Sequence, residues 1–327
     1  MDYVKLGKSD LLVSRICLGC MSFGDASGMQ NWALGYDDSE RIIKHALDKG
    51  INFFDTANCY SNGTSEEYLG RAIKKLAKRE DVILATKVYF NEGKLSKEAI
   101  HREVNKSLSR LGTDYIDLLI IHRFDYDTPI EETMSALDEV IKEGKVRYIG
   151  ASAMYAYQFA RMQDVAYYNH YHQFVSMQNH YNLIYREEER EMMKLLKEEG
   201  VSSTPYSPLA GGRLSRLWDS DTKRSQIDSF AKKKYDDNKD IDLPIVERVH
   251  ELAIKHQVSQ STVALSWLLS KEPVAAILLG ATKERYIDDA CEALSFKLTA
   301  EETNYLEELY KPHKVVGALD RDKTINS

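Results

Sequence analysis

The chain has 327 residues, of which 43% are hydrophobic and 29% charged, and its formal net charge is −7. The negative charge argues against a surface that binds nucleic acid or an anionic membrane. At this length an α/β barrel forms one domain, so we expect a single domain over residues 1–327. No apolar run approaches the roughly 18 residues of a membrane span, and the start has no signal-peptide pattern. We therefore expect a cytoplasmic protein without a membrane partner.

Eight short apolar runs predict buried strands, and segments with apolar residues at helical spacing separate them. The strands are expected at 16–19, 51–54, 82–87, 116–122, 146–150, 175–178, 201–206 and 275–279. The helices are expected at 38–49, 64–78, 96–111, 130–143, 155–164, 187–199, from 244, at 259–270 and at 283–293. The pattern also predicts a β-hairpin over 3–15 and an extra helix over 301–310.

Three local features refine this pattern. Thr64 and Glu67 have the spacing of a capping box at the start of a helix. Pro244 is expected in the first turn of the next helix, where proline is tolerated. The polar stretch 210–242, which follows the seventh predicted strand, cannot bury much surface, so we expect it to form a long mobile flap.

The alternation of strands and helices determines the predicted fold. Strands that are apolar on both faces, joined by right-handed helical crossovers, give a parallel sheet, and eight such units close into a (β/α)₈ barrel. The alternative is a doubly wound open sheet, which would need a G-x-G-x-x-G fingerprint after its first strand. The segment 19–24, Gly-Cys-Met-Ser-Phe-Gly, does not match that fingerprint.

The sequence gives no sign of a metal or disulfide framework. Its four cysteines are Cys17, Cys20, Cys59 and Cys291. They fit a reducing compartment, and the lone C-x-x-C overlaps an apolar strand and has no second pair downstream, so we expect it in the core. His170 and His172 resemble a metal pair, but no further ligand follows at a suitable spacing.

Polar residues that could transfer protons end three successive strands or follow them. Asp55 ends one strand, Tyr60 lies in the loop after it, and Lys87 and His122 end the next two. A buried carboxylate needs a cation, and so does a catalytic phenol, whose ordinary pKa is about 10. Lys87 is expected to favour the phenolate form of Tyr60. Taken one at a time, the Asp–Lys pair could be a structural salt bridge and the histidine a core residue.

Motifs along the whole chain resemble the aldo-keto reductases. The similar segments are 54–70, 86–87, 121–125, 144–152, 177–182, 206–209 and 279–282, in family order. The similarity is greatest to the microbial and fungal branch of aryl-alcohol-dehydrogenase-like and versiconal-reductase-like proteins. The resemblance implies that Tyr60 is the general acid for a carbonyl oxygen and that His122, in its neutral form, aligns that carbonyl.

None of these side chains can supply a hydride, so a cofactor must, and the resemblance implies NADPH. It implies nicotinamide contacts at Ser152, Gln178 and Tyr206, and pyrophosphate contacts at Ser207, Pro208, Leu209 and Gly211. It implies adenosine-phosphate contacts at Gly280, Thr282, Tyr286 and Asp289, with Lys283, Arg285 or Arg216 available for the phosphate. Two positions depart from the family pattern: Ala153 stands where many relatives have Asn, and Tyr286 where many have Arg or Gln.

The sequence therefore predicts an NADPH-dependent oxidoreductase that reduces aldehydes or ketones to alcohols. The expected partner is a small-molecule carbonyl compound. The alternative is a non-catalytic, cofactor-binding regulatory or interaction protein, because the chain also resembles potassium-channel β subunits, which keep the same four residues. The absence of a long basic or apolar docking segment favours the enzyme. The loops 26–35, 124–128 and 210–242, expected to contact substrate, do not identify the carbonyl.

Overall fold

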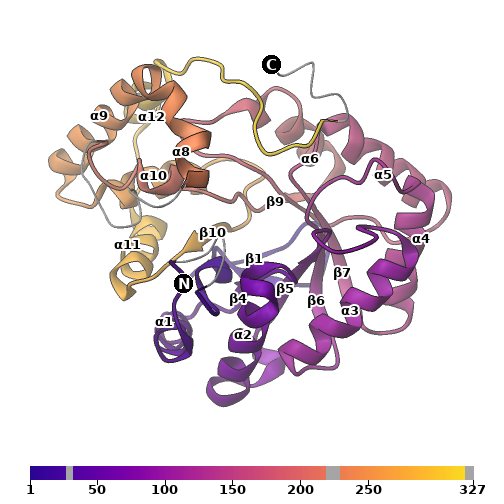
Figure 1. Cartoon of the computed structure of the whole chain (residues 1–327). Helices are drawn as coiled ribbons and strands as arrows, with labels where there is room; N and C mark the ends of the chain where they lie inside the picture. The colour runs from indigo at the N-terminus through magenta and orange to yellow at the C-terminus, as the bar shows by residue number, and fades with distance from the viewer. Residues whose placement is uncertain (27–31, 219–228, 321–327) are drawn as a thin grey trace.

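Eight parallel strands form one sheet in the order β10-β3-β4-β5-β6-β7-β8-β9, in a computed structural model that describes residues 1–26, 32–218 and 229–320 (Figure 1). The strands are β3 (Ile16–Gly19), β4 (Phe53–Asp55), β5 (Ile83–Val88), β6 (Ile116–Ile121), β7 (Val146–Ser152), β8 (Ser176–Gln178), β9 (Ser202–Ser203) and β10 (Ile277–Gly280). The amides of Ala275 and Leu278 donate to the carbonyls of Ser203 and Pro205, both at 2.9 Å, which joins β9 to β10. The predicted (β/α)₈ barrel is confirmed.

Helices surround the sheet on its outer side (Figure 1). They are α1 (Tyr36–Asp48), α2 (Thr64–Leu76), α3 (Lys97–Leu111), α4 (Ile130–Lys142), α5 (Ala156–Tyr168), α6 (Met192–Glu199), α8 (Ser229–Tyr235), α9 (Lys239–His256), α10 (Gln260–Leu269), α11 (Glu284–Ser295) and α12 (Ala300–Glu307). Among the described residues, none of these helices is both long and apolar enough to cross a membrane.

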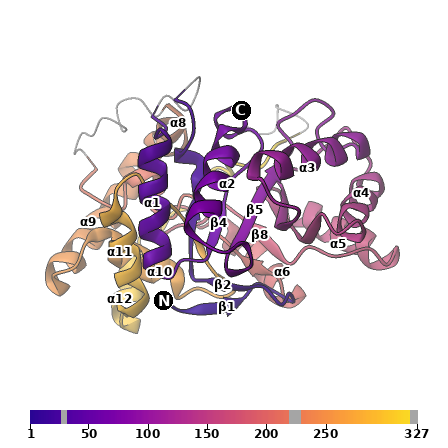
Figure 2. The same cartoon turned by 90° about the horizontal axis from the view of Figure 1, so that it is seen from below.

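The predicted hairpin, β1 (Tyr3–Lys5) with β2 (Leu12–Ser14), crosses the amino-terminal end of the barrel (Figure 2). Its buried side chains Leu6 and Val13 belong to the same apolar cluster as Phe53 in the barrel interior. The hairpin therefore plugs one end of the barrel, and any cavity for a ligand must open at the other end.

Alternation along the strands decides which residues face the interior. In β5, Ile83 and Ala85 lie in the interior cluster, whereas Leu84 packs in the layer between sheet and helices. Because side chains alternate with a period of two, Lys87 also faces inward. The same count along β4 places Asp55 on the inner side, two residues beyond Phe53. The inward positions are thus apolar near the hairpin and polar at the carboxyl ends.

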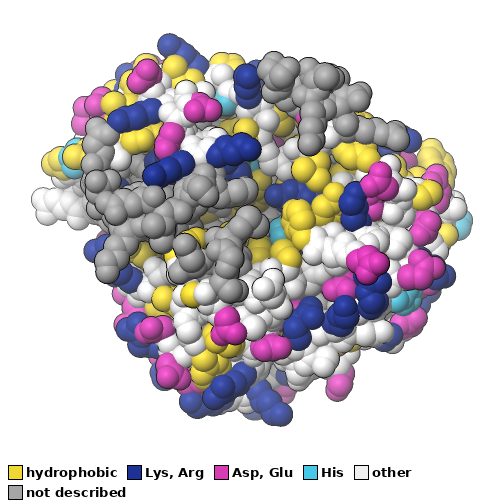
Figure 3. All heavy atoms as spheres, viewed as in Figure 1, with side chains coloured by type: hydrophobic (Ala, Val, Ile, Leu, Met, Phe, Trp, Pro, Cys, Tyr) yellow, Lys and Arg dark blue, Asp and Glu magenta, His cyan; other side chains and the backbone are white. Residues whose placement is uncertain are grey.

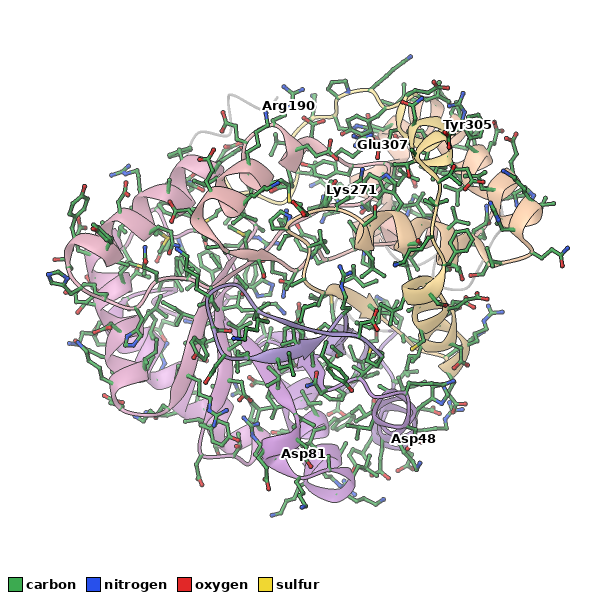
Figure 4. The ribbon with its side chains drawn as sticks, turned by 180° about the vertical axis from the view of Figure 1, so that it is seen from behind. Asp48, Asp81, Arg190, Lys271, Tyr305 and Glu307 are labelled. Atoms are coloured by element: carbon green, nitrogen blue, oxygen red, sulfur yellow. The ribbon has the colours of Figure 1, made fainter. Side chains whose placement is uncertain are left out.

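The extra C-terminal helix α12 packs against α9 and contacts α10 through Trp267, and Figure 4 shows the molecule from this side. The carboxylate of Glu307 accepts a hydrogen bond from the indole of Trp267 at 2.7 Å and pairs with Lys271. At its start, α12 has a complete capping box between Thr299 and Glu302. The predicted terminal helix is confirmed.

The chain after α12 returns across the carboxyl-terminal end of the barrel (Figure 1, yellow). The Tyr126 hydroxyl, from the loop after β6, donates to the carbonyl of Leu319 at 2.7 Å. The amide of Val316 donates to the hydroxyl of Tyr185, from the loop after β8, at 2.9 Å. Residues 311–320 are thereby fixed to loops from two separate strand ends.

Two of the local predictions were wrong. The N-cap of α2 is Gly63, and it makes no side-chain cap bond. Thr64 instead donates to the carbonyl of Ser61 at 2.8 Å and accepts from the amide of Asp25 at 2.9 Å, so its hydroxyl is committed outside the helix. Pro244 lies inside α9 rather than at its first turn, because the helix already begins at Lys239.

The predicted flap over 210–242 is only partly a loop. Residues 219–228 lie outside the described residues, but α8, a 3₁₀ turn over Asp236–Asn238 and the start of α9 occupy the stretch from 229 to 242. The lysines of α8 made this segment look like solvated loop. Residue composition could not reveal that Tyr235 of α8 contacts the loops after β8 and β9.

Close packing of α2 on α3 depends on Gly70. A Cβ atom at this position would lie 2.2 Å from the carbonyl oxygen of Leu111 and 2.7 Å from its Cα. Both are backbone atoms and cannot rotate away. Glycine in a helix interior ordinarily costs about 1 kcal/mol relative to alanine. At position 70 the close approach of α2 to α3 outweighs this low helix propensity.

We predict that Gly70→Ala lowers the free energy of unfolding by roughly 1–3 kcal/mol, since the methyl group must displace backbone. Urea denaturation measures the change. Lys74→Ala, on an exposed position of the same helix, is the control and should stay within about 0.5 kcal/mol. A Gly70→Ala protein as stable as the unmutated one would mean that α2 and α3 can separate freely.

Candidate active site

A fully buried lysine connects the polar residues at the open end of the barrel. The ammonium of Lys87 lies 2.5 Å from Oδ1 of Asp55, 2.8 Å from the carbonyl oxygen of Thr56 and 3.2 Å from the hydroxyl of Tyr60. The exposed fraction of its side chain is 0%, and that of Asp55 is 2%. The structure thus brings together three of the four predicted proton-transfer residues by direct contact.

Electrostatics keeps Lys87 charged. Burial by itself lowers the pKa of this ammonium, but the neighbouring Asp55 carboxylate and Tyr60 outweigh burial and raise the pKa above its usual value. The second oxygen of Asp55 accepts a hydrogen bond from Nε2 of Gln178 at 2.9 Å. The carboxylate is therefore held on both sides.

Tyr60 is protonated in this environment. Burial raises the pKa of its phenol, and the charge of Lys87 lowers it without cancelling the effect of burial. Lys87 therefore lowers the pKa of Tyr60, as expected, but burial raises it more, so the net shift favours the protonated phenol. A phenol that stays protonated at neutral pH is able to donate a proton.

His122 lies beside Tyr60 and is neutral. Burial lowers its pKa well below the usual value, and the charges of Lys87 and Arg123 lower it further. The rings of His122 and Tyr60 meet edge to face, with centroids 5.8 Å apart. The histidine predicted at the end of β6 therefore faces the same site in its neutral form.

A second buried carboxylate supports the strand that carries Lys87. Glu66, on α2, is fully buried and accepts from the Thr86 hydroxyl at 2.5 Å and from the Arg110 guanidinium at 2.6 Å. Thr86 precedes Lys87, so this contact holds the end of β5 against α2 and α3. Sequence analysis missed Glu66 and Arg110, because their partners are separated by 20 and 44 residues.

The residues expected around the nicotinamide lie next to this cluster. The Ser152 hydroxyl donates to the main-chain carbonyl of Gln178 at 2.9 Å. Beside Ser152, Ala153 has a left-handed backbone, with φ of 47°. The hydroxyl of Tyr206 is buried and has no hydrogen-bond partner among the described residues, and its ring stacks on His180 with centroids 5.3 Å apart. An orphaned buried hydroxyl is expected where a ligand normally completes the contacts.

The residues expected along the pyrophosphate form one turn-rich loop after β9. Ser207 and Gly211 have positive φ, at 57° and 64°, as does Gly212 at 96°. Successive residues of this kind point main-chain amides into a concave surface that suits anions. Pro208 is buried, and Leu209 packs against the core. Arg216 folds over Gly212, where a Cβ would lie 2.6 Å from its guanidinium.

The residues expected near the adenosine lie at the end of β10 and along α11. Gly280 is exposed, and a Cβ there would meet nothing within 4 Å. Thr282 and Lys283 follow at the start of α11, and Arg285 covers the ring of Tyr286 at 5.1 Å. Asp289 is partly buried, and burial raises its pKa. The orphaned Tyr206 hydroxyl, the amide-rich loop and this open surface together fit a dinucleotide.

Tyr235, on α8, is a site residue that sequence analysis missed. Its hydroxyl lies 2.7 Å from Nε2 of His180, 2.9 Å from Oγ of Ser207 and 3.2 Å from Nδ2 of Asn182, and the residue is 2% exposed. It therefore joins α8 to the loops after β8 and β9. No sequence signal marks it, because it lies in a segment predicted as a loop.

No group of three or more His, Cys, Asp or Glu side chains that could hold a metal ion occurs among the described residues. Cys17 and Cys20 are buried in and beside β3, and both are free thiols. Burial raises the pKa of each thiol. These two cysteines are therefore core residues, as the sequence predicted.

Fold and site together define a (β/α)₈ barrel with a buried Asp55–Lys87–Tyr60 cluster at its open end. The model of the aldo/keto reductase family matches residues 15–311. The chain is 43% identical to a versiconal hemiacetal acetate reductase from Aspergillus parasiticus, over 96% of this chain and 98% of that protein. It is 40% and 38% identical to aryl-alcohol-dehydrogenase-like proteins of Schizosaccharomyces pombe and Saccharomyces cerevisiae, over at least 95% of each chain.

The chain belongs to the aldo-keto reductase family, so it is an oxidoreductase of a family that acts on small carbonyl compounds and generally uses NAD(P)H. These matches confirm the resemblance to the aldo-keto reductases and to their aryl-alcohol-dehydrogenase-like and versiconal-reductase-like branch.

We predict that Tyr235→Phe lowers the free energy of unfolding by roughly 1–3 kcal/mol, because the buried side chains of His180 and Asn182 and the partly buried hydroxyl of Ser207 lose a shared partner. Thermal and urea denaturation measure the loss. Tyr167→Phe is the matched control, since Tyr167 is 66% exposed. Equal stabilities for the two variants would show that the hydroxyl of Tyr235 does not anchor α8.

Proposed function

We propose that this protein reduces aldehydes or ketones to alcohols with NADPH, and that Tyr60 is the general acid. The observation that carries the proposal is the position of the Lys87 ammonium, buried between the Asp55 carboxylate and the Tyr60 hydroxyl. A charged lysine in a dry site stabilises the phenolate that remains after proton donation. The reductase named among the relatives supports the same reaction class.

Each residue of the cluster has a separate role in this proposal. A bound nicotinamide cofactor would supply the hydride. Tyr60 donates its hydroxyl proton to the carbonyl oxygen as negative charge develops there. His122, neutral because burial lowers its pKa, gives the same oxygen a second hydrogen bond. Asp55 holds Lys87 in position through the contact at 2.5 Å.

Ser152, Gln178 and Tyr206 would hold the nicotinamide. Nε2 of Gln178 is committed to Asp55, and no described residue donates to its Oε1, which leaves that oxygen for the amide of the nicotinamide. The left-handed backbone of Ala153 suits the asparagine common in relatives, but alanine offers no side-chain hydrogen bond. In this proposal the nicotinamide amide would therefore bind without a side-chain contact at position 153.

Selectivity for NADPH would rest on the start of α11. The amides of Gly280, Ala281 and Thr282 precede this helix, and Lys283 and Arg285 add positive charge near its first turn. Tyr286 would stack on the adenine in place of a guanidinium. Charge-assisted contacts contribute about 1.5–3 kcal/mol, so NADPH should bind at least about tenfold more tightly than NADH.

We predict that Tyr60→Phe lowers the kcat of carbonyl reduction by at least about 10²-fold, because the proposed general acid is lost. The dissociation constant for NADPH should stay nearly unchanged, since the phenol acts on the substrate. Stopped-flow NADPH oxidation with a panel of aldehydes and ketones measures the first quantity, and fluorescence titration the second. A loss of only a few-fold would remove Tyr60 as the acid.

We predict a flat pH profile for reduction between about pH 6 and 9, with a fall above about pH 10. The reaction needs the protonated phenol, which is populated below its pKa, and burial raises that pKa. His122 adds no inflection near neutral pH, because its pKa lies well below the usual value. The measurement is kcat/KM against pH, and an inflection near pH 6.5 would show that His122 titrates in the working range.

A further inference from the structure

Arg123 directly follows His122 and lies partly buried at the open end of the barrel. One of its guanidinium nitrogens, Nη1, donates to the main-chain carbonyl of His122 at 2.6 Å. The guanidinium carbon lies 5.6 Å from the centre of the Phe90 ring, and that ring lies 4.9 Å from the His122 ring. Phe90 is 50% exposed. A cation and a half-exposed aromatic ring therefore flank the histidine of the cluster.

The charge of Arg123 has no acidic partner among the described residues. Other cations near this end are paired: Lys94 with Asp127, and Arg213 with Asp236. The guanidinium carries five N–H donors, of which only one has a partner in the described part of the chain. Figure 3 shows basic and hydrophobic side chains bordering the centre of this face.

The electrostatic influence of Arg123 reaches several strand ends. Its charge lowers the pKa of His122, just after β6, and acts in the same direction on the pKa of Tyr206, after β9, and of Cys59, after β4. Groups from three separate loops therefore experience the same cation. The guanidinium therefore lies beside the residues proposed for proton transfer, next to His122, whose ring meets that of Tyr60.

The chemistry of this group selects an anion. A guanidinium is always charged in proteins, and its planar fork matches the two oxygens of a carboxylate. Because no carboxylate of the described residues pairs with this partly buried group, its remaining donors are available to a ligand. The ring of Phe90 offers an apolar wall between this fork and His122.

We propose that Arg123 binds a carboxylate on the substrate, so that carbonyl compounds carrying a carboxylate at a short apolar distance are the preferred class. The carbonyl lies toward Tyr60 and His122, the apolar part of the substrate lies along Phe90, and the carboxylate pairs with Arg123. This inference rests on the proposed reductase function and narrows its substrate class. Arg123 is a specificity-determining residue in this arrangement.

The test compares 4-formylbenzoate with its methyl ester as substrates, because the two differ in charge and carry the same reacting aldehyde. The acid should have a KM lower by about tenfold or more, with a similar kcat. Arg123→Gln should remove this difference by raising the KM of the acid about tenfold more than the KM of the ester. Arg123→Lys, which keeps the charge but loses the fork, should give an intermediate KM.

Lys94→Gln is the matched control, since it removes a cation that is already paired and should leave the preference for the acid intact. Equal KM values for acid and ester in the unmutated protein, or a persisting preference in folded Arg123→Gln, would overturn the carboxylate site and leave the reductase proposal standing. Turnover of neither probe nor any other carbonyl would instead refute the reductase proposal. Calorimetric titration with 4-(hydroxymethyl)benzoate then decides on Arg123 alone: binding that Arg123→Gln abolishes supports the site, and binding that it leaves unchanged overturns it.

Discussion

A charged amine with no exposure to solvent is the constraint on which the open end of this barrel depends. Removing an ammonium from water costs several kcal/mol unless close partners compensate, so Lys87 requires its three oxygen contacts. The sheet supplies them through its register. Asp55 on β4 is opposite Ala85 on β5, two residues before Lys87. The long side chain of Lys87 reaches back to the carboxylate and still contacts Tyr60 in the loop beyond.

The same constraint explains why polar residues gather at one end only. Near the hairpin, the interior is filled mainly by an apolar cluster whose side chains could not compensate a buried charge. At the carboxyl ends, Asp55 accepts hydrogen bonds from both Lys87 and Gln178. The main-chain carbonyl of Gln178 in turn accepts a hydrogen bond from the Ser152 hydroxyl. The proposed acid Tyr60 and two of the proposed nicotinamide contacts, Gln178 and Ser152, are therefore parts of one hydrogen-bonded group. In the proposed function, this group couples the position of the cofactor to that of the proton donor.

The barrel could be predicted from the sequence because its signals are local. Apolar runs marked the strands, and their alternation with helices determined the architecture. The positions of Asp55, Lys87 and His122 at strand ends were sufficient to expect that they converge. The network of Glu66 and Arg110 and the anchor at Tyr235 could not be predicted, because each joins segments that are distant in the chain and carry no motif. The prediction of a capping box at Thr64 was wrong because contacts outside the helix, with Ser61 and Asp25, take up the hydroxyl that the local motif requires.

The pairing of β10 with β3 has a consequence for the order in which the chain can fold. Ile277 is the register partner of Ile16, so the barrel joins a strand made at the beginning of synthesis to one made near the end. Until Gly280 has left the ribosome, β3 and the most recent strand each present unpaired amides and carbonyls. The open end is completed later still, when the segment that includes Leu319 docks on Tyr126. A nascent chain halted within α9 is thus an open, curved sheet with two edges available for pairing with other chains.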